Sequence, residues 1–141
     1  MLTINKDEMK CIALFESLTG VVVKDCLISE GSMAFVVKEG QMGRAIGKGG
    51  ESINRVRKAF AGKGVFVFES AKEERAFVEN LFRPAKIKDL NFREKDNARV
   101  AVVSVDSADR GIVIGREGER IKMARLLLLR HFNIDLKLLS R

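Results

Sequence analysis

Apolar residues follow two kinds of spacing along this chain, and the same order of spacings occurs twice. They recur every three or four positions where we expect helices, and gather in short β-branched or aromatic runs where we expect strands. In the first half the predicted order is helix, strand, strand, short helix, longer helix and strand, over residues 5–18, 21–28, 33–37, 41–46, 51–61 and 65–68. The second half repeats this order over residues 71–82, 85–92, 100–105, 107–114, 119–131 and 134–139. The pattern predicts an α+β fold built twice.

Turn-forming residues separate the predicted elements. Gly20 ends the first helix, residues 30–32 (Glu-Gly-Ser) turn between the first two strands, and Pro84 closes the first helix of the second half. A charged turn is predicted at residues 93–97. Within the first helix, the spacing predicts one apolar stripe, which includes Met9, Ile12, Ala13 and Phe15.

An internal repeat accompanies this pattern. Residues 43–57 and 111–125 align at an offset of 68, and seven of their fifteen positions are identical. Three of the identities are glycine pairs: Gly43 with Gly111, Gly47 with Gly115, and Gly50 with Gly118. Chance rarely pairs three glycines in so short a stretch, so we infer an internal duplication.

Length and composition are compatible with two small domains. Hydrophobic residues make up 46% of the 141 residues, enough for a packed core. We expect domains at residues 1–70 and 71–141, one for each copy of the repeated order. No Gly-, Ser- or Pro-rich linker separates the halves, so we expect the two units to pack into one rigid body. The formal net charge of +7 divides into +2 (10 basic, 8 acidic) and +5 (16 basic, 11 acidic). A basic excess favours an anionic partner, either nucleic acid or an acidic surface.

Other residue types exclude several functions. Cys11 and Cys26 lie among apolar neighbours with no Cys-x-x-Cys pair, which is typical of buried thiols in a reducing compartment. No apolar run approaches the roughly 18 residues of a membrane span, and the N-terminus is unlike a signal peptide, so we expect a cytoplasmic protein. His131 is the only histidine and has no second ligand at metal-binding spacing. We therefore expect no metal, no cofactor, no small-molecule substrate and no catalytic residues.

Each half carries a glycine-rich loop between its short and long helices. The loops read Ile-Gly-Lys-Gly-Gly at residues 46–50 and Ile-Gly-Arg-Glu-Gly at residues 114–118. Glycine permits positive φ and a close approach of ligand to main chain, and the helix that follows presents free N–H groups at its positive end. With Lys48 or Arg116 alongside, such a loop suits a phosphate group.

Two common phosphate-binding patterns do not fit these loops. The pattern Gly-x4-Gly-Lys-Ser/Thr fails because Gly43 and Lys48 are one residue too close and Gly49 replaces the hydroxyl residue. The dinucleotide pattern Gly-x-Gly-x-x-Gly fails because Ser52 occupies its last position. Both of those loops also follow a strand, whereas these follow a short helix. A nucleotide-hydrolysing enzyme is therefore disfavoured, and a simple turn between helices is the alternative interpretation.

The two loops resemble the Gly-x-x-Gly loops of KH domains, which clamp about four nucleotides of single-stranded nucleic acid. The order α-β-β-α-α-β resembles the type II KH arrangement. A tandem of two such units resembles the RNA-binding core of the archaeal NusA-like transcription factor family. The resemblance covers nearly the whole chain. In contrast to the bacterial pattern, we expect no N-terminal polymerase-binding domain and no S1 domain.

The resemblance implies a set of RNA-binding residues in each half. In the first half these are Arg44, Ile46, Gly47, Lys48, Gly49, Gly50 and Ile53. In the second half they are Arg110, Ile114, Gly115, Arg116, Glu117, Gly118, Arg120, Ile121 and Lys122. Loop amides and the basic residues would contact phosphates, while the isoleucines would floor a groove for bases. Core packing is the alternative role for all four isoleucines, and for Ile53 and Ile121 the two roles are equally compatible with the sequence. Glu117 weakens the second loop, although the basic residues around it could outweigh one carboxylate.

The function implied by the resemblance is a single-stranded RNA-binding transcription factor of the NusA type, with no enzymatic activity. It would affect elongation, pausing or termination, with RNA polymerase or other transcription factors as further partners. A KH protein of ribosome assembly or translation is the alternative, because it would share every motif. For the second half, Glu117 also leaves open a protein-interaction module that has lost RNA binding.

Overall fold

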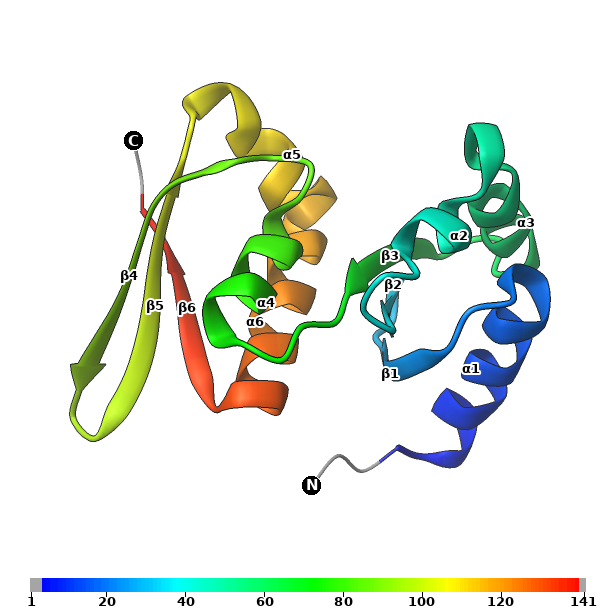
Figure 1. Ribbon diagram of the computed structural model, residues 1–141, viewed down its shortest axis with the longest axis horizontal. Helices are drawn as coiled ribbons and strands as arrows, with labels where there is room; N and C mark the ends of the chain where they lie inside the picture. Colours follow the sequence, from blue (N-terminus) through cyan, green and yellow to red (C-terminus); the bar gives the residue numbers. More distant parts are fainter. Residues whose placement is uncertain (1–3, 140–141) are drawn as a thin grey trace. The chain divides into compact units, whose positions relative to one another are not determined.

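The computed structural model describes residues 4–139, which form two compact units that divide between Ala71 and Lys72. Each unit contains a three-stranded mixed sheet together with helices, so the predicted α+β class is confirmed. Figure 1 shows the first unit in blue to green and the second in green to red. None of the helices among the described residues combines the length and the apolar character that a membrane span requires.

The first unit follows the predicted order of elements. These are α1 (Lys6–Thr19), β1 (Val23–Ile28), β2 (Ser32–Val37), α2 (Met42–Ile46), the 3-10 turn η1 (Lys48–Gly50), α3 (Glu51–Ala59) and β3 (Gly64–Glu69). Strand β2 lies in the centre of the sheet, antiparallel to β1 and parallel to β3. A parallel pair needs a long crossover connection, and the segment from α2 to α3 supplies it. The glycine loop therefore lies within the crossover.

Local signals set both ends of α1. The Glu8 amide donates to the Asn5 side chain at 2.8 Å, and the Asn5 amide donates to the Glu8 carboxylate at 2.9 Å. This reciprocal pair is a capping box, which satisfies two amides that the helix leaves unbonded. Gly20 ends the helix with φ 73°, the left-handed conformation that glycine adopts without steric cost.

The apolar stripe predicted for α1 is partly wrong. Met9 is 60% exposed and Ala13 is also exposed, whereas Phe15 is fully buried and Ile12 packs against the core. At about 100° per residue, Met9 and Phe15 lie roughly 120° apart around the helix, so one narrow stripe cannot hold both. Helical spacing shows which residues share a face, but contact with the sheet decides which face is buried.

The second unit repeats the order of the first. Its elements are α4 (Glu74–Phe82), β4 (Ile87–Lys95), β5 (Ala98–Val105), the 3-10 turn η2 (Ser107–Asp109), α5 (Arg110–Ile114), the 3-10 turn η3 (Arg116–Gly118), α6 (Glu119–Phe132) and β6 (Ile134–Leu138). Strand β5 is central, antiparallel to β4 and parallel to β6. The predicted order α-β-β-α-α-β is thus observed in both units.

Two predicted boundaries in the second unit are wrong. Helix α4 begins at Glu74, three residues later than expected. The predicted five-residue turn is a two-residue turn at Asp96 and Asn97, with φ of 53° and 67°. Two successive positive φ angles match the twist of the flanking strands, and Asp and Asn tolerate them. Strand β4 therefore continues through the charged residues up to Lys95.

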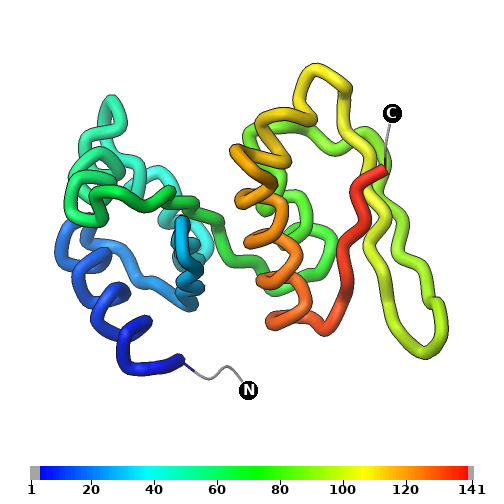
Figure 2. Tube along the Cα trace, turned by 180° about the vertical axis from the view of Figure 1, so that it is seen from behind, coloured from blue at the N-terminus to red at the C-terminus, as the bar shows by residue number. Residues whose placement is uncertain are grey.

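Only one face of the second sheet is covered by helices of its own unit. In Figures 1 and 2, α4 and α6 lie on the same side of the strands β4, β5 and β6. Ala101, Val103 and Leu136 point to that side and are buried. Because side chains alternate along a strand, Val100, Val102 and Lys137 lie on the opposite face.

Candidate nucleic-acid interface

The two glycine loops have the same backbone conformation. Gly47 has φ and ψ of 79° and 169°, and Gly115 has 77° and 174°. The last glycines agree as well, with 78° and 14° at Gly50 and 72° and 12° at Gly118. The duplicated sequence therefore folds into a duplicated loop, each between a five-residue helix and a longer one.

The first glycine of each loop is required for two physical reasons. Its positive φ with an extended ψ is essentially restricted to glycine. It also has no space for a side chain: a Cβ on Gly47 would lie 2.8 Å from the Ser52 amide nitrogen, and one on Gly115 would lie 2.7 Å from the Arg120 Cβ. The loop thus folds back tightly onto the start of the following helix.

Residue 49 of the first loop and its counterpart, residue 117 of the second, differ in identity but not in conformation. Gly49 has φ 63° and ψ 21°, and Glu117, its counterpart, has φ 55° and ψ 24°. A Cβ on Gly49 would meet nothing within 4 Å, so a side chain there projects into open space. Glu117 occupies that position in the second loop and is exposed, so it adds a negative charge at the loop surface.

Main-chain amides at the start of each long helix have few internal partners. Gly50 donates to the Gly47 carbonyl at 3.1 Å, and Gly118 donates to the Gly115 carbonyl at 3.1 Å. Neither α3 nor α6 has a side-chain cap. The amides of Glu51 and Glu119 donate to the Lys48 and Arg116 carbonyls. The next amides of each helix have no intrahelical acceptor, so they are the ones available to an anion, at the positive end of the helix dipole.

The first loop has two exposed cations. Lys48 lies within the loop and is exposed, and Arg44 lies on the preceding helix α2. The only bond recorded for Arg44 among the described residues is a long one, 3.5 Å, to the Gly20 carbonyl. The nearby Glu51 carboxylate pairs with Arg55 at 2.5 Å, which offsets its charge. The first loop therefore presents a net positive surface.

The second loop has fewer accessible cations than its sequence suggests. Arg120 donates to the Leu81 carbonyl at 3.0 Å and to the Arg83 carbonyl at 2.6 Å, and burial lowers the pKa of its guanidinium. Arg110 donates to the Leu139 carbonyl. Both side chains thus bind main-chain carbonyls of their own unit and are only partly exposed, which leaves them less available to RNA than the sequence suggests. Arg116 and Lys122 are exposed and remain candidates.

The four candidate isoleucines divide by burial. Ile46 is 40% exposed, and Ile114 and Ile121 are half-buried, so these three are accessible to a base. Ile53 is only 7% exposed and packs in the core of the first unit. Of the two roles that the sequence allowed for Ile53, the structure supports core packing.

Sequence reasoning missed two features of the second unit. Ile112 takes the place of Arg44 in the repeat and is 57% exposed, so an apolar side chain stands where the first unit has a cation. Alternating basic residues on β4 and β6, including Arg93, Lys95 and Lys137, lie on the uncovered sheet face. The period-two pattern of Arg93 and Lys95 is the signal that could have revealed the second feature.

Metal-binding groups, the histidine and the cysteines are the other features of residues 4–139 that could carry a site. This part of the chain contains no group of three or more His, Cys, Asp or Glu side chains placed to hold a metal ion. His131 packs its ring 5.2 Å from that of Phe77. Cys11 and Cys26 are free thiols, and burial, the largest cause, raises the pKa of Cys11. A raised pKa disfavours the reactive thiolate at neutral pH.

Comparison with known proteins identifies the class of the fold. The KH domain family matches residues 11–71, which span most of the first unit and its glycine loop. A crystal structure of the protein APE1850 covers 96% of this chain and all of its own, with a TM-score of 0.78 and 36% sequence identity. The molecule is therefore a KH-domain protein.

The curated relatives are more specific. The probable transcription termination protein NusA of Halococcus morrhuae is 38% identical over 133 residues, which cover 94% of each chain. The protein of the same name from Methanocaldococcus jannaschii is 34% identical over 128 residues, which cover 91% of this chain and 69% of the relative. The chain belongs to the family of archaeal NusA-like proteins.

Proposed function

We propose that this protein is a single-stranded RNA-binding transcription factor of the NusA type, without enzymatic activity. Its two units, residues 1–70 and 71–141, would be tandem type II KH domains. The observation that carries the proposal is the glycine loop that occurs twice with one backbone conformation, each time before a helix without a side-chain cap. Membership of the NusA-like family supports RNA as the anionic partner.

The proposed mechanism is a backbone clamp. The phosphates of a single strand approach the loop, where unbonded amides and the positive end of α3 or α6 favour negative charge. Lys48 in the first loop and Arg116 in the second add mobile cations. The bases then lie against aliphatic side chains, Ile46 in one unit and Ile114 and Ile121 in the other.

The two clamps are unequal in this proposal. The first has Arg44, Lys48 and no acidic residue in the loop itself. The second has Ile112 in place of Arg44, Arg116 in place of Lys48 and Glu117 in place of Gly49. Its Arg110 and Arg120 are engaged within the unit. We therefore expect the first loop to supply most of the phosphate affinity, while the second holds the strand more weakly.

The proposed biological role follows from the names of the relatives. They are described as probable transcription termination proteins, which supports action on the nascent transcript during elongation, pausing or termination rather than ribosome assembly. RNA polymerase or other transcription factors would be the protein partners, and the cytoplasm the place of action. RNAs recovered from a random pool would separate the two roles, since a translation factor would enrich ribosomal segments.

The decisive experiment is RNA binding by two loop variants. Lys48→Asp with Gly49→Asp should lower the affinity for selected single-stranded RNA at least about tenfold, because it replaces a cation and adds two carboxylates. Arg116→Asp with Glu117→Asp should lower it less, because the second loop already carries one carboxylate. Both changes suit the local backbone, as Asp tolerates the left-handed conformation of positions 49 and 117. If both variants stay folded by circular dichroism and bind RNA as the wild type does, the clamp proposal fails.

A further inference from the structure

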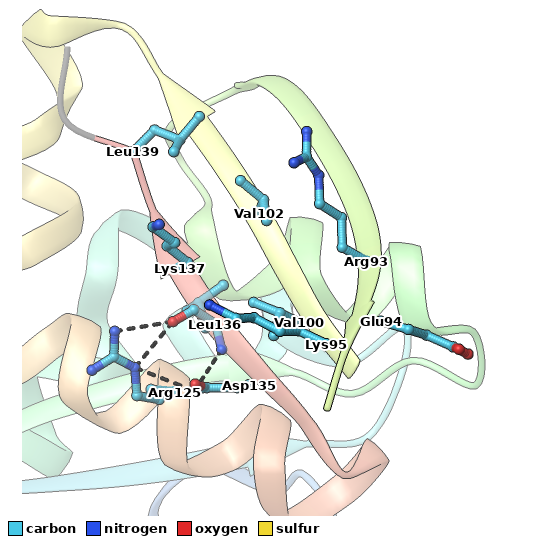
Figure 3. Close-up of a pocket in the computed structure, with 10 residues that line it drawn as sticks. All are labelled: Arg93, Glu94, Lys95, Val100, Val102, Arg125, Asp135, Leu136, Lys137 and Leu139. Atoms are coloured by element: carbon cyan, nitrogen blue, oxygen red, sulfur yellow. Dashed lines mark hydrogen bonds and ion pairs between the residues drawn. The ribbon is translucent and has the colours of Figure 1, made fainter. Parts of the chain in front are cut away.

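The uncovered face of the second sheet contains a groove. This outer face, opposite α4 and α6, is formed by Arg93, Lys95, Val100, Val102, Lys137 and Leu139. The groove has a volume of about 660 Å³ and is open to solvent (Figure 3). It extends across all three strands, and at the β6 edge it reaches Arg125 of α6. None of the residues predicted to bind RNA lines it.

Three cations of the outer face are not neutralised by nearby carboxylates. Among the described residues, Arg93, Lys95 and Lys137 take part in no recorded ion pair. The two acidic residues of the groove are accounted for. Asp135 lies 3.6 Å from Arg125, and Glu94 is opposite Arg99 in the strand register and points away from the groove in Figure 3.

The floor between these cations is aliphatic. Val100 and Val102 of β5 are half-buried and lie along the middle of the face, with Arg93 beside one edge and Lys137 beside the other. None of the residues that line the groove is aromatic, and Phe92 of β4 lies on the opposite face with Ala101. A ligand for this surface must be anionic and long enough to meet several cations, and it gains nothing from ring stacking.

One end of the outer face connects to the second glycine loop. Leu139 lines the groove, and its carbonyl accepts a hydrogen bond from Arg110, the first residue of α5. Helix α5 has five residues, and Gly115, the first glycine of the loop, follows its last residue. At 1.5 Å per residue, this helix is about 7.5 Å long. The Leu139 end of the groove and the loop are therefore separated by this short helix and the Arg110 side chain, whereas Arg93 and Lys95 lie toward the other end of the groove, beside the turn between β4 and β5.

We propose that the outer face binds the phosphate backbone of RNA that continues beyond the second glycine loop. This inference rests on the proposed function, because the loop is what brings the strand to the unit. A strand held at the loop would be present at high effective concentration near the groove, so weak contacts suffice. The contacts we expect are with the phosphate backbone, since the outer face offers cations and aliphatic side chains.

The test compares two lengths of RNA. The first is the shortest segment selected by the wild-type protein whose affinity depends on both Lys48 and Arg116, so that both loops are already occupied. The second is the same segment extended by about eight uridines, on its 5′ or its 3′ side. The proposal expects one of the two extensions to raise the affinity. With three phosphate contacts, the plot of log affinity against log salt should be steeper by about 2 for that RNA.

Charge reversal at the outer face should remove this gain. The variant Arg93→Glu, Lys95→Glu and Lys137→Glu should bind the short RNA within about twofold of wild type and lose both the gain from extension and the steeper salt dependence. The matched control reverses three exposed lysines of the first unit, Lys6, Lys10 and Lys24, and changes the net charge equally. The control should keep the gain, which separates a local site from general electrostatics.

Each other outcome overturns the proposal in a recognisable way. If wild type binds the short RNA but gains nothing from either extension, the outer face is no RNA site, while the proposed function stands. If wild type binds neither length, both proposals fail. If the extension gain survives charge reversal and a peptide of alternating Glu and Leu binds the wild type but not the variant, the occupant is an acidic protein segment instead of RNA.

Discussion

At the scale of single residues, glycine is used in these loops for two separable purposes. Gly47 needs both a positive φ and the space that a Cβ would take from Ser52. Gly49 needs only a positive φ, because a Cβ there would meet open space. A side chain at Gly47 therefore meets both a glycine-only conformation and crowding, whereas one at Gly49 meets only the left-handed conformation.

We predict that Gly47→Ala is the more damaging of these two changes. It should lower the free energy of unfolding by about 2–3 kcal/mol, because strain in a glycine-only region adds to the close contact with the Ser52 main chain. Gly49→Ala should cost about 1 kcal/mol, the usual penalty of the left-handed region. Urea unfolding followed by circular dichroism measures both. Equal losses would mean that crowding at Ser52 is unimportant.

A second residue-scale prediction concerns Arg120, whose guanidinium binds two carbonyls at the end of α4. Arg120→Ala should lower stability by about 2 kcal/mol, since it leaves those carbonyls without a charged donor. RNA affinity should stay within about twofold of wild type. Lys122→Ala is the matched control: it should leave stability within about 0.5 kcal/mol and weaken RNA binding at low salt. A large affinity loss in a folded Arg120→Ala protein would return Arg120 to the binding surface.

At the scale of elements, the unit that occurs twice in this chain is the whole segment of short helix, loop and long helix. The two copies have the same conformation although Glu117 replaces Gly49, and the following helices differ in length by five residues. The main-chain conformation of the loop thus accepts either glycine or glutamate at positions 49 and 117. The net charge of the loop can therefore change while its conformation stays the same. Affinity and shape can be changed independently.

This independence leads to a prediction for Glu117→Gly. The change removes a carboxylate from the second loop and relieves a non-glycine residue at φ 55°. We expect RNA affinity to rise severalfold at low salt, and stability to rise by about 0.5–1 kcal/mol. Fluorescence anisotropy with a selected RNA and thermal unfolding measure the two effects. Higher stability without tighter binding would indicate that the second loop does not contact phosphate.

At the scale of the whole molecule, total charge does not locate the binding site. The second half carries +5 and the first only +2, yet each loop region has two exposed cations, Arg44 and Lys48 in the first and Arg116 and Lys122 in the second, and only the second loop carries a carboxylate, Glu117. Arg110, Arg120 and Arg125 account for part of this difference, because each donates to a carbonyl of its own unit. The cations that remain accessible, and not the net charge, determine where a phosphate binds.

Salt dependence tests this distinction in the intact protein. The logarithm of RNA affinity should fall linearly with the logarithm of salt concentration, because each neutralised phosphate releases counterions. Lys48→Ala should make the slope shallower by about 0.7, the value for one contact with a single strand. Lys10→Ala removes the same charge from an exposed position of α1 and should leave the slope unchanged. Equal slopes for the two variants would contradict a specific contact at Lys48.

The sequence by itself determined the order of the elements, the duplication and the positions of both loops. These features depend on local physics: helical and strand spacing, the capping residues Asn5 and Gly20, and a loop geometry that requires glycine at Gly47 and Gly115. A short segment contains all the information for such choices. Their outcome therefore agrees with the structure to within a few residues.

Only the tertiary structure decided which side chains are available. Arg120 and Arg116 are both basic residues of the second loop region, yet Arg120 reaches carbonyls 37 and 39 positions earlier in the chain while Arg116 stays exposed. Ile46 and Ile53 are similarly divided between surface and core. Local spacing cannot contain this information, because burial and hydrogen bonding depend on which distant segments the fold brings into contact.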